Sequence, residues 1–147
     1  MIVDETNIQI LKHLKDGRKS FKIIAEDLSV TENTIRSRVN KLLNEGILNF
    51  SGNVQIDALP GHTLLYLGVK LKSMELQKKA AEFSDLRGVI SAAIVTGRYD
   101  IILQVLLGQD YNLLEFITEQ VAKVGDVQTV ESFIVYKGYN LNVPYIL

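Results

Sequence analysis

The sequence predicts an α+β protein of two small domains, a group of three helices followed by a βαββαβ unit. Apolar residues recur with the 3.6-residue period of helices up to about residue 45. Residues 63–137 instead alternate between strand-like and helix-like segments. Between them lies NFSGNVQIDALPG, which is rich in turn-forming residues. We therefore expect domains at 1–50 and 63–147, joined by a linker at 51–62.

The composition is that of a folded protein without membrane spans or cysteine chemistry. Of the 147 residues, 47% are hydrophobic and 22% are charged. No apolar run approaches the roughly 18 residues of a membrane-spanning helix, and MIVDETNIQ lacks the features of a leader, so we expect a cytoplasmic protein. The absence of cysteine excludes disulfides and thiolate metal sites, and we expect no cofactor and no metal. A net charge of −1 excludes a generally basic nucleic-acid coat.

The first two helices each follow a side chain that can cap them. Asp4 precedes the first helical pattern, which stops at Asp16-Gly17, and Ser20 precedes the second. A capping side chain accepts a hydrogen bond from an amide in the first turn of its helix. The apolar residues expected to face inward from these two helices are Ile8, Leu11, Leu14, Ile23, Ile24 and Leu28.

A third helix follows after a connection of only two residues, Ser29-Val30. Thr31 caps it, it runs to about Asn44, and Gly46 closes it. Three short helices with such a tight link between the second and third are typical of a helix-turn-helix DNA-binding domain. Residues 47–57 are compatible with either a wing hairpin or an extended connector to the second domain.

The third helix has an apolar stripe on one side and amide, hydroxyl and cationic groups on the other. At about 100° per residue the inward stripe consists of Ile35, Val39, Leu42 and Leu43. Amides can pair with adenine, and hydroxyls and cations can reach bases or phosphates. The alternative is a solvent-exposed polar surface on an ordinary helical bundle. Such a surface more often mixes Glu with Lys. Here the two glutamates, Glu32 and Glu45, stand at the ends of the helix and are expected toward the core side. The expected DNA-binding residues are Asn33, Thr34, Arg36, Ser37, Arg38, Asn40 and Lys41.

The second half predicts a ferredoxin-like fold, with two helices on one face of an antiparallel sheet. The expected strands are 63–72, 89–96, 101–107 and 127–137. One helix at 74–85 should bury Leu76, Ala80 and Phe83. Asp110 should cap the other, whose inward residues are expected to be Leu113, Leu114, Ile117, Val121 and Val124.

The strands of this domain are apolar on both faces, which predicts a homodimer. In the third strand Ile102 and Leu106 lie on the face opposite Ile101 and Leu103. Two helices cover only one face of a sheet, so the other face needs a cover as well. Two sheets packed face to face would provide it, and a two-fold dimer would bring two recognition helices to two DNA half-sites.

Five segments, taken in order, resemble the Lrp/AsnC family, also called feast/famine regulators, over nearly the whole chain. VDETNIQIL resembles the family's opening Leu-Asp-x-x-Asp-x-x-Ile-Leu, with Asn7 where the family usually has its second Asp. TGRYDIILQV resembles the Gly-x-x-Asp hairpin of its effector domain. The other matching segments are DGR, TENTIRSRVNKLLNEGIL and VQTVESFIVY.

The resemblance implies a transcription regulator that binds double-stranded DNA and is built from dimers, often assembled into tetramers or octamers. Its effector would be a small molecule, commonly an amino acid, bound between dimers. Carried onto this chain, the effector site falls on Gly97, Tyr99, Asp100 and Ser132. Structural roles remain equally open for two of these residues, because Gly97 can supply a turn conformation and Asp100 can bond nearby amides.

Two other functions share this layout. An architectural DNA-binding protein without an effector would use the same helix and the same oligomer. Haem-pathway decarboxylases of similar layout would need cationic and imidazole groups in the second domain, which has no histidine beyond His62 and only Arg87 and Arg98 as arginines. We find no paired carboxylates, nucleophile–base set or phosphate-binding glycine loop, so we expect no catalytic residues and a protein that is not an enzyme.

Overall fold

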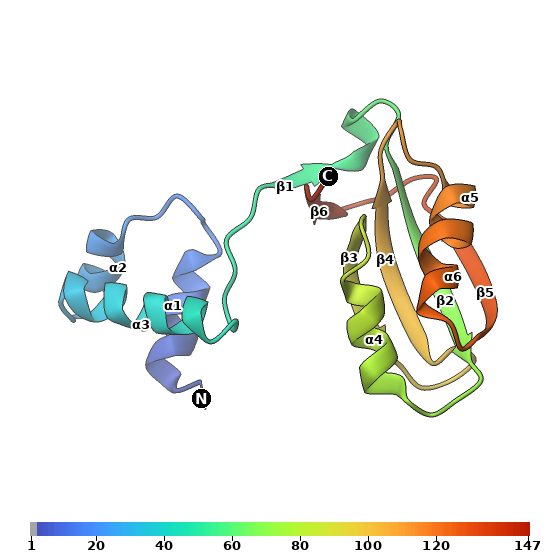
Figure 1. Ribbon diagram of the computed structural model, residues 1–147. Coiled ribbons are helices and arrows are strands. Elements are labelled where there is room, and N and C mark those ends of the chain that lie inside the picture. Colours follow the sequence, from blue (N-terminus) through green and yellow to red (C-terminus); the bar gives the residue numbers. More distant parts are fainter. Residues whose placement is uncertain (1–2) are drawn as a thin grey trace. The chain divides into compact units, whose positions relative to one another are not determined.

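The computed structural model describes residues 3–147, which form two compact units (Figure 1). One unit extends to Phe50 and the other runs from Ser51 to Leu147. Met1 and Ile2 of the expected first domain lie outside the described residues. Within the described chain, no helix has the length and apolar character needed to cross a membrane.

Three helices form the first unit, and they begin where the sequence predicts. Asp4, Ser20 and Thr31 each accept a hydrogen bond from a backbone N–H in the first turn of the helix that follows. Gly46, with a φ of +67°, follows the last helix as expected. The helices are α1 (Glu5–Leu14), α2 (Phe21–Asp27) and α3 (Glu32–Asn44).

The core of this unit differs from the expected one at two isoleucines. Ile8 is 39% exposed and Ile23 is 46% exposed, whereas Ile10 and Ile24 are fully buried. On α1, Ile8 lies about 200° from Ile10 and therefore faces away from the core. On α2, Ile23 lies about 100° around the helix from Ile24, and only Ile24 is buried in the cluster formed by the three helices. The inward stripe of α3 is confirmed, since Ile35, Val39 and Leu42 are buried and Leu43 packs against their cluster.

The second unit contains a four-stranded antiparallel sheet with strand order β3-β4-β2-β5. Figure 1 shows both of its helical segments on the same face of this sheet, so the predicted ferredoxin-like fold is confirmed. The elements are β2 (Thr63–Leu71), α4 (Leu76–Ser84), β3 (Val89–Ile94), β4 (Ile101–Leu107), α5 (Leu113–Glu115), the π-helical segment η2 (Phe116–Val121), α6 (Ala122–Val124) and β5 (Val127–Ile134).

The second helical segment begins later than expected. Asn112, not Asp110, caps it, and Asn112 and Glu115 form a capping box in which each side chain bonds the other's backbone N–H. With the helix beginning after Asn112, Phe116 is fully buried in the core and Leu114 is 71% exposed. The prediction of Leu114 as an inward residue is therefore wrong. Phe83 of α4 is buried as predicted.

Residues 51–62, expected to form a linker, are part of the second unit. They contain β1 (Asn53–Gln55) and the short 3-10 helix η1 (Ile56–Ala58). β1 pairs antiparallel with β6 (Asn142–Pro144), a three-residue strand that was not among the expected elements. The segment therefore does not form a wing on the helix-turn-helix unit, because its pairing partner lies near the C-terminal end of the other unit.

The sheet face opposite the helices is partly covered by the chain itself. Leu64 and its cross-strand neighbour Leu106 are buried at one end of this face. Leu64 lies beside Ile56 and Leu141, which come from the segments around β1 and β6. The middle of the face is more open, with Phe133 45% exposed. The uncovered apolar face is thus smaller than the sequence alone suggests.

Candidate nucleic-acid interface and ligand-binding region

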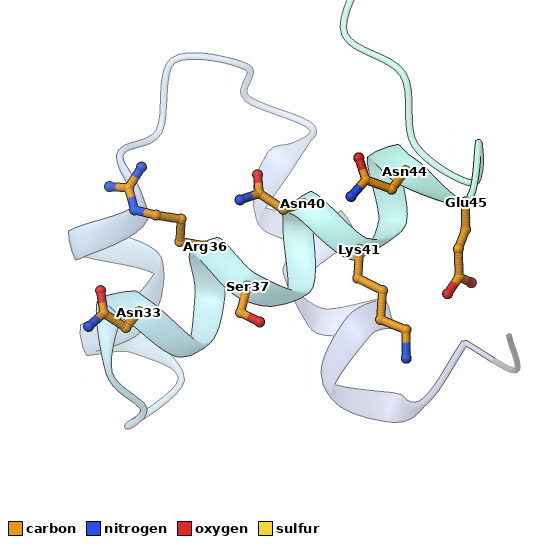
Figure 2. Close-up of a pocket in the computed structure, with 7 residues that line it drawn as sticks. All are labelled: Asn33, Arg36, Ser37, Asn40, Lys41, Asn44 and Glu45. Atoms are coloured by element: carbon orange, nitrogen blue, oxygen red, sulfur yellow. The ribbon is translucent and has the colours of Figure 1, made fainter.

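The outward side of α3 presents two rows of polar side chains along an open hollow (Figure 2). Glu45 was expected toward the core side, but it lies one turn beyond Lys41 and lines the hollow. One of the two rows therefore ends in a carboxylate. Asn44 also lines the hollow, and the set of expected DNA-binding residues did not include it. The two rows are Asn33, Ser37, Lys41 and Glu45, and Arg36, Asn40 and Asn44.

Arg36 is held in place by two neighbours within its own unit. Its Nη2 donates to Glu32 Oε1 at 2.8 Å, one helical turn earlier. Its guanidinium carbon lies 5.4 Å from the centre of the Phe21 ring on α2. The side chain is still more than half exposed, so it remains accessible to a phosphate while being oriented by the protein.

Arg38 connects α3 to the start of α1. Its Nη1 donates to Asp4 Oδ2 at 2.7 Å and to Asn7 Oδ1 at 3.1 Å. Asn7 is buried, and the Asp4 carboxylate also caps α1. The hydrogen bond from Arg38, followed by the one from the Asn7 backbone, lowers the pKa of Asp4 below its usual value. This geometry favours a role for Arg38 in fixing the angle between the helices over direct contact with DNA.

Thr34 also contributes to local structure. Its backbone N–H donates to Thr31 Oγ1 at 3.2 Å, and the two hydroxyl oxygens lie 2.9 Å apart. Thr34 is therefore part of the N-terminal cap of α3. Of the seven predicted DNA-binding residues, five line the hollow, and Thr34 and Arg38 do not.

Replacing Arg38 by alanine is expected to loosen α1 from α3 and lower the melting temperature of the first unit. The salt dependence of DNA binding should stay unchanged, because no phosphate contact is lost. A double-mutant cycle with Asp4→Ala, followed by thermal denaturation, measures the coupling. Lys12→Ala, at an exposed position of α1, is the matched control for stability. If the slope of the logarithm of the DNA-binding constant against the logarithm of the salt concentration became smaller by about one, Arg38 would contact a phosphate instead.

In the second unit, Asp100 attaches the β3–β4 hairpin to β2. Its carboxylate accepts hydrogen bonds from Lys70 Nζ and from the Leu71 backbone N–H, each at 2.8 Å. The Lys70 bond, followed by the Leu71 bond, lowers the pKa of Asp100. Gly97 adopts a φ of +110°, which favours glycine in this turn. Both residues therefore have structural roles in this fold.

Tyr99 packs across the sheet face that lacks helices. Its ring lies against Gly68, where an added Cβ would be 2.7 Å from three ring carbons. Its hydroxyl donates to the Glu131 carboxylate, which also pairs with Arg98 at 3.2 Å. The hydrogen bond to Glu131, with burial as the next cause, raises the pKa of Tyr99. A glycine inside a strand signals a close approach by another group, and Gly68 could have been singled out on that basis.

Ser132 is not brought together with the hairpin residues. It pairs with Leu67, whose side chain lies in the core on the helical side of the sheet, whereas Glu131 pairs with Gly68. Because side chains alternate along a strand, Ser132 and Tyr99 belong to opposite faces. Among the described residues, no group of three or more histidine, aspartate or glutamate side chains could hold a metal ion.

Replacing Asp100 by asparagine is expected to make the second unit less stable at neutral pH, with a smaller difference in acid. A lowered folded-state pKa stabilises the fold above the ordinary carboxyl pKa, and this contribution is lost as the pH falls through the folded-state value. Urea denaturation of both proteins between neutral pH and about pH 2.5 tests this. Asp85→Asn, at an exposed site, should show no such pattern. A difference that does not vary with pH would contradict the assigned ion pair.

Comparison with known proteins places both units in one family. Residues 3–43 match the AsnC-type helix-turn-helix domain, and residues 64–143 match the Lrp/AsnC ligand binding domain. An uncharacterised HTH-type transcriptional regulator of Pyrococcus abyssi is 30% identical over 134 residues, covering 90% of this chain and 85% of that protein.

Solved structures agree with this result. The crystal structure of PH0061 has a TM-score of 0.80 and 26% identity, covering 97% of this chain and 99% of that one. A transcriptional regulator of Neisseria meningitidis, crystallised as a complex with L-Met, has a TM-score of 0.67 and 23% identity. The match covers 91% of this chain and 90% of that one, and at this identity it shows the fold alone.

Proposed function

Because the chain belongs to the Lrp/AsnC family of transcriptional regulators, we propose that it is a dimeric, sequence-specific DNA-binding regulator that responds to a small molecule. The observation that carries the proposal is the outward side of α3, where amide, hydroxyl and cationic groups line an open hollow. We assign DNA binding to residues 1–50, and ligand binding and dimerisation to residues 63–147.

Within α3 the proposed DNA contacts come from Asn33, Arg36, Ser37, Asn40 and Lys41. These side chains face outward from the second helix of a helix-turn-helix, the element that enters the major groove in this class of protein. Thr34 and Arg38 support them indirectly, by capping α3 and by fixing it to α1.

The proposed dimer forms through the open face of the sheet. Phe133 is 45% exposed there, and Tyr66 and Ile102, on the same face, are half-buried. A second copy packed on this face would bury these groups and place two copies of α3 on two half-sites.

Replacing Ile102 by glutamate is expected to convert the dimer to a monomer and to weaken DNA binding, because a carboxylate would be buried between the sheets. Sedimentation velocity measures the mass, and circular dichroism checks that the fold is kept. Gln77→Glu, on the exposed side of α4, adds the same charge away from this face and should leave the dimer intact. A dimeric, folded Ile102→Glu variant would place the interface elsewhere.

An amino acid is the proposed class of effector. The match of residues 64–143 to a ligand-binding domain supports a ligand, and the Neisseria regulator in complex with L-Met supports this class. The hairpin of Gly97, Tyr99 and Asp100 is the proposed contact region. A site that also uses Ser132 would need a second chain, since Ser132 lies on the other sheet face.

A gel-shift titration tests the proposed function. The purified protein is titrated against the DNA upstream of its own gene and against scrambled DNA, at fixed salt, with and without the twenty amino acids. Preferential binding that shifts with the amino acids supports the full proposal. Equal binding to both DNAs favours an architectural protein, and preferential binding without a shift removes the amino-acid effector.

A further inference from the structure

The geometry points to a second small-molecule site on this chain, which binds an amino acid as a zwitterion at the end of the sheet opposite the β3–β4 hairpin. In this site Arg87 holds the carboxylate of the ligand and Asp110 holds its ammonium group. The inference goes beyond the proposed function, which places the effector at the hairpin and uses neither of these residues.

The site is a hollow of about 340 Å³ formed by residues that stand just before or just after the strands of the second unit. Gly108, on its wall, follows Leu107, which pairs with Thr63 at the first residue of β2. The hairpin is attached at the other end of β2, at Lys70 and Leu71. Eight residues of strand separate Thr63 from Leu71, or about 26 Å, so one ligand cannot occupy both regions. The side chains around the hollow are His62, Arg87, Gln109, Asp110, Tyr145 and Leu147.

Arg87 is held in an orientation that leaves most of its donors free. Its guanidinium carbon lies 4.9 Å from the centre of the ring of Tyr111, and burial of Tyr111 fixes that ring. A guanidinium that lies over a ring keeps the N–H groups on its edge available, and their fork matches the two oxygens of a carboxylate. Among the residues that the structure describes, the one carboxylate paired with Arg87 is that of Asp110.

The pair of Arg87 and Asp110 is open enough to admit a ligand. Nη2 of Arg87 lies 3.5 Å from Oδ2 of Asp110, and the two side chains are 57% and 77% exposed. Such a long, exposed ion pair contributes little, so opening it costs little. Asp110 is also not needed as a helix cap, because Asn112 has that role.

The opposite charges of this pair select the class of ligand. A simple anion would be attracted by Arg87 but repelled by Asp110, and a simple cation would meet the reverse. An amino acid carries its carboxylate and its ammonium group on the same carbon, so it can satisfy both side chains at once. The volume agrees, because about 340 Å³ is near the lower limit for ligand pockets and suits a single amino acid.

The rest of the wall is fixed by contacts within the protein. Nδ1 of His62 donates to the Pro60 carbonyl at 3.1 Å, and the His62 and Tyr145 rings lie 5.7 Å apart. Gln109 donates to the same carbonyl at 3.0 Å. Two rings and the Leu147 side chain thus form an apolar wall for the side chain of the ligand. A wall that is already ordered loses little freedom on binding.

Ligand analogues test the zwitterion requirement on the full-length protein. Saturation-transfer NMR shows which of the twenty L-amino acids bind, and calorimetric titration measures the dissociation constants of the tightest one, its amide and its deaminated acid. The amide lacks the carboxylate, and the deaminated acid lacks the ammonium group. We expect each analogue to bind about 10- to 150-fold more weakly, which is the effect of losing one charged hydrogen-bonding contact.

Two variants locate the binding. Arg87→Gln should bind the amino acid and its amide equally weakly, whereas Arg18→Gln, at an exposed position of the first unit, should keep the preference of the wild type. Gly108→Leu should block the hollow without changing its charge, because an added Cβ already lies 3.3 Å from Asp110 Oδ1 and from Leu147 Cδ1. Circular dichroism checks that both variants are folded, and either folded variant is sufficient for the test.

The other outcomes distinguish this site from the hairpin. Binding that is lost in Tyr99→Ala but kept in Arg87→Gln and Gly108→Leu would assign the amino acid to the hairpin alone. That result would overturn the inference and leave the proposed function intact. Binding of the amide or the deaminated acid as tightly as the amino acid would also overturn it. If none of the twenty amino acids bound, the inference and the proposed amino-acid effector would both be wrong, and the gel-shift titration would still decide the DNA-binding function.

Discussion

Ile35→Ala is expected to unfold the helix-turn-helix unit and abolish DNA binding while the second unit stays folded. Ile35 is fully buried in the cluster that joins the three helices, together with Ile10 and Ile24. Removing a buried isoleucine side chain costs about 2–5 kcal/mol. A unit of about 50 residues has a free energy of unfolding of about 3–8 kcal/mol in total, so most or all of its stability is lost.

Thermal denaturation followed by circular dichroism should show one transition at lower temperature and one unchanged. Ile8→Ala is the matched control, because this isoleucine is in the same unit but 39% exposed, and it should cost much less. Equal destabilisation by the two substitutions would mean that the helices pack differently. Retention of DNA binding by a destabilised Ile35→Ala protein would show that DNA refolds the unit, which a titration at increasing DNA concentration would reveal.

Gly68→Val is expected to displace Tyr99 and to destabilise the second unit by about 1–3 kcal/mol, the usual cost of overpacking. A Cβ at this position would lie 2.7 Å from three carbons of the Tyr99 ring, so the ring must move. The hydroxyl would then leave Glu131, and the hairpin that carries Asp100 would lose one of its attachments to the sheet. The response of DNA binding to amino acids should change as well, since the proposed effector region includes this hairpin.

Urea denaturation measures the loss of stability, and a second substitution tests its cause. In the double variant Gly68→Val with Tyr99→Ala, the smaller side chain removes the overlap, so part of the loss should be recovered. Gly52→Ala serves as the control, because an added Cβ there meets nothing within 4 Å and the φ is not positive. If the stability losses of the two single variants simply add up in the double variant, the Tyr99 ring is not the cause of the destabilisation by Gly68→Val.

Local signals in the sequence were sufficient for most of the fold. The caps at Asp4, Ser20 and Thr31 follow from hydrogen bonds within four residues, and the inward stripe of α3 follows from its period. The family resemblance and the ferredoxin-like fold are confirmed by the two matched domains and by the sheet order. Where two neighbouring side chains were equally suitable, as with Ile23 and Ile24, tertiary packing decided between them.

Contacts between distant residues could not be derived from the sequence. β1 and β6 are three residues each, too short for a recognisable pattern, and they pair across most of the second unit. The bond from Arg38 to Asp4 joins residues 34 positions apart, so the helix pattern alone suggested that Arg38 faced DNA. Asp110 and Asn112 are both good caps, and only the capping box with Glu115 distinguishes them.

The pairing of β1 with β6 makes the tether between the two units short. Leu48 still packs against the first core, and the Gly52 carbonyl already accepts from the Tyr145 backbone N–H at 3.2 Å. The intervening chain can span at most about 14 Å. In the proposed dimer each DNA-binding unit could therefore move only within a small volume, and its effective concentration at its own half-site would be high.

Operators with altered half-site spacing should then be bound poorly. A few glycines inserted after Phe50 should restore binding to these operators and weaken binding to the natural spacing.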